Sequence, residues 1–174
     1  MIPHPLPASV TMFALLAAPV LAAPPDLQTP APVIYLSDNL DEVDRLGWCI
    51  DTLGRGFAEH LQAHSCKPQG GDVQFALDKN LGHIRSVEFT GYCMEFVPRA
   101  DPVFALATCQ EGSPRQRFTY DSATQALSPA DDPTLCVADA AQSRPAGPFL
   151  SRTLLMAPCQ DTDAALRRWT VLDG

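Results

Sequence analysis

Six cysteines are the residues whose chemistry the sequence constrains most, because their spacing repeats along the chain. Within successive pairs the second cysteine follows the first by 17, 16 and 23 residues, and the first members are 44 and 43 residues apart. Six cysteines allow 15 pairings, but this regular spacing favours one. The expected bridges are Cys49–Cys66, Cys93–Cys109 and Cys136–Cys159. We therefore expect three units of about 43 residues, the last with an insertion.

Other reactive residues form no recognisable catalytic set. His60 and His64 have metal-like spacing close to Cys66, but Cys66 is assigned to a bridge and a fourth ligand is not evident. The sequence contains no G-x-S-x-G nucleophile motif, no P-loop and no dinucleotide-binding fingerprint. We therefore expect a protein that is not an enzyme and holds neither a metal nor a cofactor.

The elements that position the cysteines read as short strands. Apolar residues alternate around each first cysteine and before each second cysteine, which is typical of half-buried strands. An aromatic residue follows each second cysteine at +9, +9 and +10, namely Phe75, Phe118 and Trp169. Turn residues separate these runs, as in Pro68–Asp72 and Ser128–Pro133. This pattern predicts an all-β barrel or sandwich in which three small units share one core.

Composition fits one globular domain of ordinary polarity. The 174 residues include 18% charged and 46% hydrophobic residues, with 17 prolines that disfavour long helices. The net charge of −8 argues against nucleic acid or anionic lipid as the main partner.

The N-terminus has the features of an export signal. Residues 1–25 carry no charged side chain, and Val10–Ala22 is an apolar run too short to span a membrane. The run ends in the small residue Ala22, which predicts a signal peptide over residues 1–22. A buried N-terminal core segment is the alternative, because the basic n-region is missing. Residues 23–32 then read as a Pro-rich leader without packing, residues 33–174 as the folded domain, and the protein as secreted or periplasmic with its cysteines oxidised.

The chain resembles the ricin B-type lectin family over roughly residues 33–174. Each family repeat carries Cys-x-Asp, a second cysteine and Gln-x-Trp. The matching segments here are Cys49-Ile-Asp51, Cys93-Met-Glu95 and Cys136-Val-Ala138, followed by Val73-Gln-Phe75, Gln116-Arg-Phe118 and Arg167-Arg-Trp169. The resemblance implies an all-β fold, a β-trefoil of three repeats, each pinned by one disulfide.

The resemblance also implies a sugar pocket in the first repeat. The family's acidic residue, aromatic platform, neighbouring glutamine and polar residue before the aromatic correspond to Asp51, His64, Gln62 and Asp72. A carboxylate can accept two sugar hydroxyls, an amide can bridge adjacent hydroxyls, and an aromatic ring can stack on the C–H face of a sugar. Asp51 also fits a turn residue bonded to the backbone, since Thr52-Leu-Gly54 follows.

The other two repeats match the sugar-site pattern less well. Glu95 and Gln116 provide a possible second site, where Ala107 replaces the platform. The third repeat has Ala138 and Ala157 at these positions, so we expect no binding there.

We therefore expect an exported, non-catalytic carbohydrate-binding module whose partner is a glycan or glycoconjugate, with about millimolar affinity per site. The alternative is a structural or protein-interaction trefoil with eroded sugar sites. One form of this alternative is a cell-binding subunit of a multi-subunit toxin, similar to the trefoil subunits of cytolethal distending toxins, whose partner would be another protein subunit.

Overall fold

The computed structural model describes residues 23–174, so the predicted signal peptide over residues 1–22 lies outside the described residues. Regular structure among the described residues is β apart from two single 3-10 turns, η1 (Pro114–Gln116) and η2 (Ala164–Leu166). The strands are β1 (Val33–Leu36), β2 (Trp48–Thr52), β3 (Leu61–Ser65), β4 (Phe75–Asp78), β5 (His83–Ser86), β6 (Tyr92–Phe96), β7 (Phe104–Thr108), β8 (Phe118–Asp121), β9 (Ala126–Pro129), β10 (Leu135–Asp139), β11 (Arg144–Ala146), β12 (Phe149–Arg152), β13 (Leu154–Pro158) and β14 (Trp169–Leu172). No helix in this part of the chain is long and apolar enough to span a membrane.

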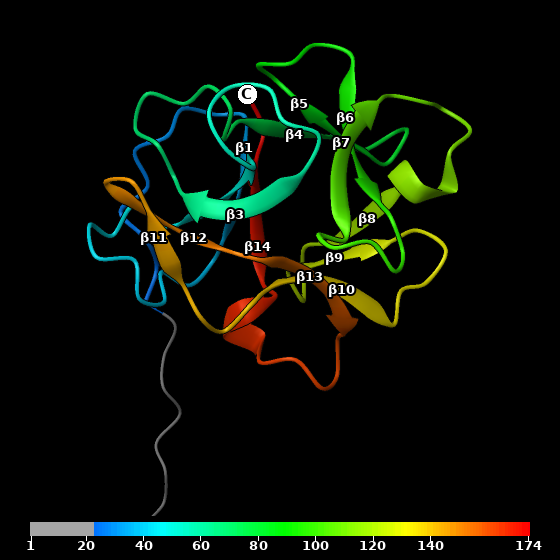
Figure 1. Ribbon diagram of the computed structural model, residues 1–174. Helices are drawn as coiled ribbons and strands as arrows, with labels where there is room; N and C mark the ends of the chain where they lie inside the picture. Colours follow the sequence, from blue (N-terminus) through cyan, green and yellow to red (C-terminus); the bar gives the residue numbers. More distant parts are fainter. Residues whose placement is uncertain (1–22) are drawn as a thin grey trace, which may run out of the picture.

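The three expected disulfides are confirmed. Bridges join Cys49 to Cys66, Cys93 to Cys109 and Cys136 to Cys159. The first cysteine of each bridge lies in the first strand of an antiparallel pair, β2–β3, β6–β7 or β10–β13. In Figure 1, β3, β7 and β13 lie on three sides of a common centre. Because β1 pairs with β14, the two ends of the domain are joined in one sheet.

Among the described residues a main apolar core draws on strands from all three disulfide-linked units, and a smaller buried cluster surrounds the Cys49–Cys66 bridge. The aromatic residues predicted from the cysteine spacing, Phe75, Phe118 and Trp169, are all buried. Two indole N–H groups are satisfied by backbone carbonyls, because Trp48 donates to Asn39 and Trp169 donates to Val137. Burial of these large rings accounts for much of the hydrophobic stabilisation of a fold built from short strands.

The Pro-rich leader packs against the domain, so the expectation that it remains unpacked is wrong. Thr29 is buried and its hydroxyl donates to the Lys67 carbonyl at 2.8 Å. The Gln74 side chain donates to the Pro30 carbonyl at 3.0 Å. At Gly47, where φ is +87°, a Cβ would lie 2.8 Å from Pro25. Backbone and side-chain bonds therefore hold this segment although it lacks regular structure.

The insertion in the third unit forms a hairpin that crosses to the first unit. Strands β11 and β12 pair with each other, and β12 pairs with β3 through Ser151↔His64 and Arg152↔Ala63. Figure 1 shows β11 and β12 beside β3. The six-stranded sheet consequently has the order β11-β12-β3-β2-β1-β14. Without β12, the strand β3 would present an unpaired edge.

Candidate functional site

The β2–β3 hairpin brings the first group of predicted site residues onto one face. Asp51 pairs across the two strands with Gln62, and Cys49 pairs with His64. Because strand side chains alternate, these four residues share a face, whereas Trp48 and its alternating neighbours enter the core. The register of the hairpin therefore places the acid, the amide and the imidazole side by side.

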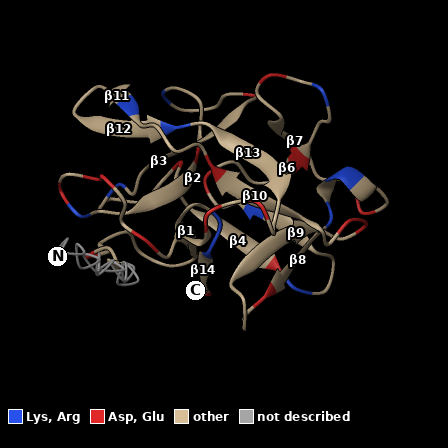
Figure 2. Ribbon diagram, turned by 90° about the horizontal axis from the view of Figure 1, so that it is seen from below, with Lys and Arg blue, Asp and Glu red and all other residues tan. Residues whose placement is uncertain are grey.

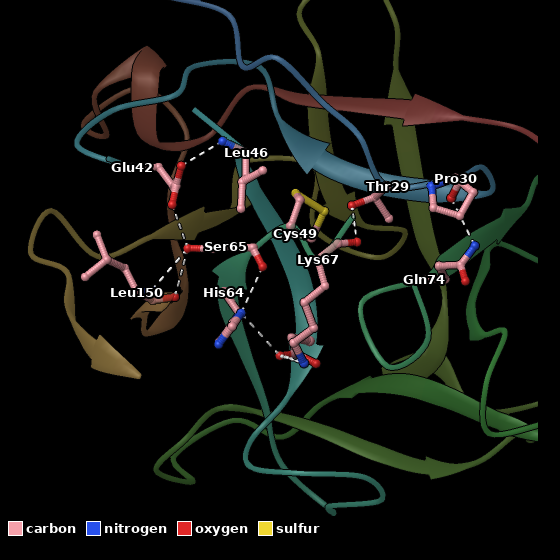
Figure 3. Close-up of a disulfide and its surroundings, with 12 residues drawn as sticks. Thr29, Pro30, Glu42, Leu46, Cys49, His64, Ser65, Lys67, Gln74 and Leu150 are labelled. Atoms are coloured by element: carbon pink, nitrogen blue, oxygen red, sulfur yellow. Dashed lines mark hydrogen bonds and ion pairs between the residues drawn. A yellow bond between two sulfur atoms is a disulfide. The ribbon is translucent and has the colours of Figure 1, made fainter. Parts of the chain in front are cut away.

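A lysine that the sequence analysis did not identify links the two predicted carboxylates. The Lys67 ammonium lies 3.1 Å from Asp51 Oδ2 and 2.6 Å from Asp72 Oδ1. Lys67 directly follows the bridged Cys66, so the disulfide fixes the start of its side chain. Figure 3 shows this side chain extending past the disulfide to the level of His64, whose Nδ1 lies 3.7 Å from the same Asp51 oxygen.

Asp51 is fully buried on strand β2, and burial controls its protonation. Its Oδ1 atom has no hydrogen-bond partner among the described residues. Burial raises the pKa of Asp51 from 3.8 to about 7, although the Lys67 charge acts in the opposite direction. Asp51 therefore has no surface open to a ligand in this arrangement. The carboxylates of Asp51 and Asp72 therefore hold the ammonium in place.

The His64 ring is neutral and oriented by the backbone. Nδ1 lies 2.9 Å from the Ser65 carbonyl oxygen, so this nitrogen is the protonated one and donates. Burial is the largest influence on the pKa of His64 and lowers it. Nε2 is consequently left as a hydrogen-bond acceptor.

The hairpin β11–β12 contacts both His64 and Gln62. The Phe149 ring meets the His64 ring edge to face, with centroids 5.4 Å apart and an interplanar angle of 63°. An Arg144 N–H donates to Gln62 Oε1 at 3.1 Å, while Gln62 Nε2 donates to the Thr52 carbonyl at 3.3 Å. Gln62 therefore has one polar contact to its own hairpin and one to the third unit.

Between the two hairpins lies a cavity of about 330 Å³, which we call the first-repeat hollow. Its lining residues are Gly54, Arg55, Gln62, His64, Lys67, Ala146, Gly147, Pro148 and Phe149. The hollow unites the predicted Gln62 and His64 with Lys67 and Phe149, two residues that sequence reasoning missed. Asp51 and Asp72 are not part of the lining and lie against Lys67 instead.

The two residues of the second predicted site, Glu95 and Gln116, lie in contact. Gln116 Nε2 in η1 donates to Glu95 Oε2 of β6 at 2.8 Å, and its Oε1 accepts the Gln110 backbone N–H. A cavity of about 400 Å³ is lined by Glu95, Gln110, Gly112, Ser113, Pro114 and Arg115. Gln116 is fully buried, so it orients Glu95 from behind the cavity.

A disulfide uses the cysteine of the metal-like group His60, His64 and Cys66. Cys66 is bonded to Cys49 and offers no thiolate to an ion beside His60 and His64. Within residues 23–174, His83 lies close to the sulfurs of Cys93 and Cys109, but these sulfurs also form a disulfide. Neither group therefore has the donor set of a thiolate metal site.

Comparison with known proteins identifies the family and the fold of the chain. A family model for the ricin-type β-trefoil lectin domain matches residues 40–169. The β-trefoil lectin of the Vibrio vulnificus haemolysin/cytolysin superposes with a TM-score of 0.53 at 19% identity, covering 82% of this chain and 93% of that chain. An agglutinin from Abrus precatorius superposes with a TM-score of 0.55 at 16% identity, covering 83% of this chain and 48% of the agglutinin chain. A search of curated proteins by sequence finds no significant match.

The predicted β-trefoil fold is confirmed by these structural neighbours. This chain spans about half of the agglutinin chain, so the remainder of that protein has no counterpart here. Domains of the matched family are carbohydrate-binding modules and generally carry no catalytic activity. Because the family model matches most of the sequence, the chain belongs to the ricin-type β-trefoil lectin domain family.

Proposed function

We propose that the protein is a non-catalytic carbohydrate-binding module whose main binding site is the first-repeat hollow. The observation that carries this proposal is the joint presence of Gln62, His64 and Lys67 around one open cavity. An amide, an imidazole acceptor and an ammonium together offer the donors and acceptors that sugar hydroxyls require. The β-trefoil lectin of Vibrio vulnificus, which shares the fold, has N-acetyl-D-lactosamine bound in its solved structure.

The roles of the predicted residues differ within this proposal. Gln62 and His64 contact the sugar, while Asp51 and Asp72 position the Lys67 ammonium through their ion pairs. Glu95, held by Gln116, supplies a weaker second site without an aromatic platform, because Ala107 lies opposite Cys93 on the neighbouring strand. An open site of this kind has an affinity of about millimolar, or about −4 kcal/mol, so several copies acting together would strengthen attachment.

A glycan array followed by titration of the best ligand tests the proposal. Gln62→Ala should weaken binding about tenfold, since one or two hydrogen bonds worth about 1 kcal/mol each are lost. The matched control is Gln160→Ala, because Gln160 is exposed and lies outside the first-repeat hollow. Thermal unfolding of both variants checks that the fold is intact. Equal binding by wild type and Gln62→Ala would reject the first-repeat site.

A protein-interaction module is the second candidate. It is favoured by the complete burial of Asp51, because a carboxylate without exposed surface contributes nothing directly to a sugar. In this case the protein would bind a partner subunit, one form being the cell-binding subunit of a multi-subunit toxin. Crosslinking of the exported protein in the producing cells' own medium or periplasm should then recover one defined partner protein, and free sugars should not displace this partner.

We also infer that the protein is exported after cleavage behind Ala22. The support is the apolar N-terminal run together with three disulfides, which persist in oxidising compartments. N-terminal sequencing of the protein from culture medium or periplasm should begin at Ala23. A chain that retains Met1 in these fractions would contradict export by this signal.

A further inference from the structure

The first-repeat hollow has walls from two different units of the trefoil. Gln62 and His64 come from β3, whereas Ala146, Gly147, Pro148 and Phe149 come from the tip of the β11–β12 hairpin. The hairpin exists because the cysteines of the third unit are 23 positions apart in the sequence, compared with 17 and 16 in the others. The cavity beside Glu95 in the second repeat is lined by no residue of another unit's hairpin and by no aromatic residue. The insertion therefore supplies the first-repeat hollow with an aromatic lining residue, Phe149.

The hairpin is held firmly in this position. The Leu150 N–H donates to the Ser65 hydroxyl at 3.1 Å, and that hydroxyl donates to Glu42 at 3.0 Å. At the end of β12, Arg152 is 2% exposed, stacks over the Trp48 ring at 4.5 Å and donates to the Ala140 carbonyl. These contacts join the hairpin to the core and to the first unit. The Phe149 ring is thus preorganised, and little ordering cost falls on ligand binding.

The charged side chains that line the hollow are basic, although the chain as a whole is acidic. The net charge of the protein is −8, yet the charged residues lining the hollow are Arg55 and Lys67. The nearest carboxylates, Asp51 and Asp72, are both paired with Lys67. Arg55 is exposed and makes no ion pair within residues 23–174. Figure 2 shows a further basic position on β11, beside β12, and Arg144 of this strand contacts Gln62.

We propose that the first-repeat hollow selects an acidic sugar residue, one that carries a carboxylate or a sulfate. Arg55 binds the acidic group, because a guanidinium offers paired N–H donors to such an anion. Phe149 packs against the C–H face of the ring, and Gln62 contacts its hydroxyls. Neutral His64 meets the Phe149 ring edge to face and offers its Nε2 atom to the sugar, as in the proposed function. This inference rests on the proposed carbohydrate-binding function and adds the ligand class and the contribution of the third unit.

Matched pairs of glycans test the selectivity. The probes are methyl glucoside and methyl glucuronide, methyl galactoside and methyl galacturonide, and N-acetyllactosamine with its sialylated and 6-sulfated forms. The wild-type protein should bind at least one acidic member about tenfold more tightly than its neutral counterpart, and this preference should decrease as salt rises. The carboxylated and sulfated members show which acid is preferred.

Variants separate the two parts of the proposal. Arg55→Gln should reduce the acidic preference to near unity, whereas Arg117→Gln, an exposed arginine outside the hollow, should behave as wild type. Phe149→Ala should weaken acidic and neutral ligands alike by about tenfold, and Phe149→Tyr should restore binding. Equal affinity for neutral and acidic partners, or unchanged binding by Arg55→Gln and Phe149→Ala, would overturn the inference while carbohydrate binding stands. A complete absence of glycan binding would overturn the proposed function itself.

Discussion

Replacement of Asp51 by asparagine should make the stability of the protein respond differently to pH. Asp51 has no exposed surface, and burial raises its pKa from 3.8 to about 7 in the folded state. Between these two values the folded protein binds more protons at this residue than the unfolded chain does. The free energy of unfolding contributed by Asp51 is therefore greatest at low pH and decreases as pH rises from about 4 to 7.

The size of this effect follows from the shift of the pKa. Each unit corresponds to about 1.4 kcal/mol, so the rise from 3.8 to about 7 amounts to as much as about 4 kcal/mol of lost stability by pH 8. Asparagine does not titrate and keeps nearly the same volume. The difference in unfolding free energy between Asp51→Asn and wild type should thus move in favour of the variant by this order of magnitude as pH rises.

Denaturant unfolding with intact disulfides, measured from about pH 4 to pH 8, provides the assay. Asp121→Asn is the control, because the exposed Asp121 carboxylate accepts bonds from Thr124 and Ala123 that lower its pKa. Its contribution to stability is therefore fully present above the unfolded-state pKa and is lost only as pH falls below it, so the difference between Asp121→Asn and wild type should stay nearly constant from about pH 5 to pH 8. If the difference between Asp51→Asn and wild type does not change with pH, then the Lys67 charge compensates for burial, and our reasoning about Asp51 is refuted.

Three further predictions concern the fold and the second site. Replacing both Cys136 and Cys159 by serine should lower the free energy of unfolding by about 3 kcal/mol, read from denaturant curves, because a loop is no longer closed in the unfolded chain. Phe75→Ala should cost about 3–5 kcal/mol in the same assay, whereas Phe57→Ala, at a side chain 46% exposed, should cost clearly less; similar losses would contradict the assignment of Phe75 to the core. Gln116→Ala should cost about 1–3 kcal/mol, because the Gln116 bonds to Glu95, the Thr108 carbonyl and the Gln110 N–H are lost, and NMR titration should show weaker sugar responses around the second site.

The sequence was sufficient to predict the fold because its information is local and repeated. Cys49 and Cys66 lie at the same end of one hairpin, so their separation of 17 residues reflects the lengths of two strands and a loop. The aromatic residue after each bridge is buried for the same reason in each unit. Trp169 occupies the last such position, and its indole N–H is satisfied by Val137, which no spacing pattern could indicate.

The candidate site was predicted only in part. Gln62 and His64 line the hollow, as expected from strand alternation on β3. Lys67 was missed because its importance depends on a folded loop that brings Asp72 to within 2.6 Å. Phe149 was missed because the hairpin that carries it joins β3 through contacts such as Leu150–Ser65, which span 85 residues of chain. An unequal cysteine spacing reveals an insertion but not the place to which it folds.

The three disulfide-linked units differ in the residue that lies two positions after the first cysteine. In the first unit Asp51 is buried against Lys67, in the second Glu95 is oriented by Gln116, and in the third Ala138 carries no polar group. Repetition therefore specifies the core, because each unit must complete the same apolar interior. Binding has no such requirement, since a ligand needs only one complete cavity. The third unit, which has Ala138 at this position, instead provides the aromatic wall of the first-repeat hollow, so this site is built from two of the three units.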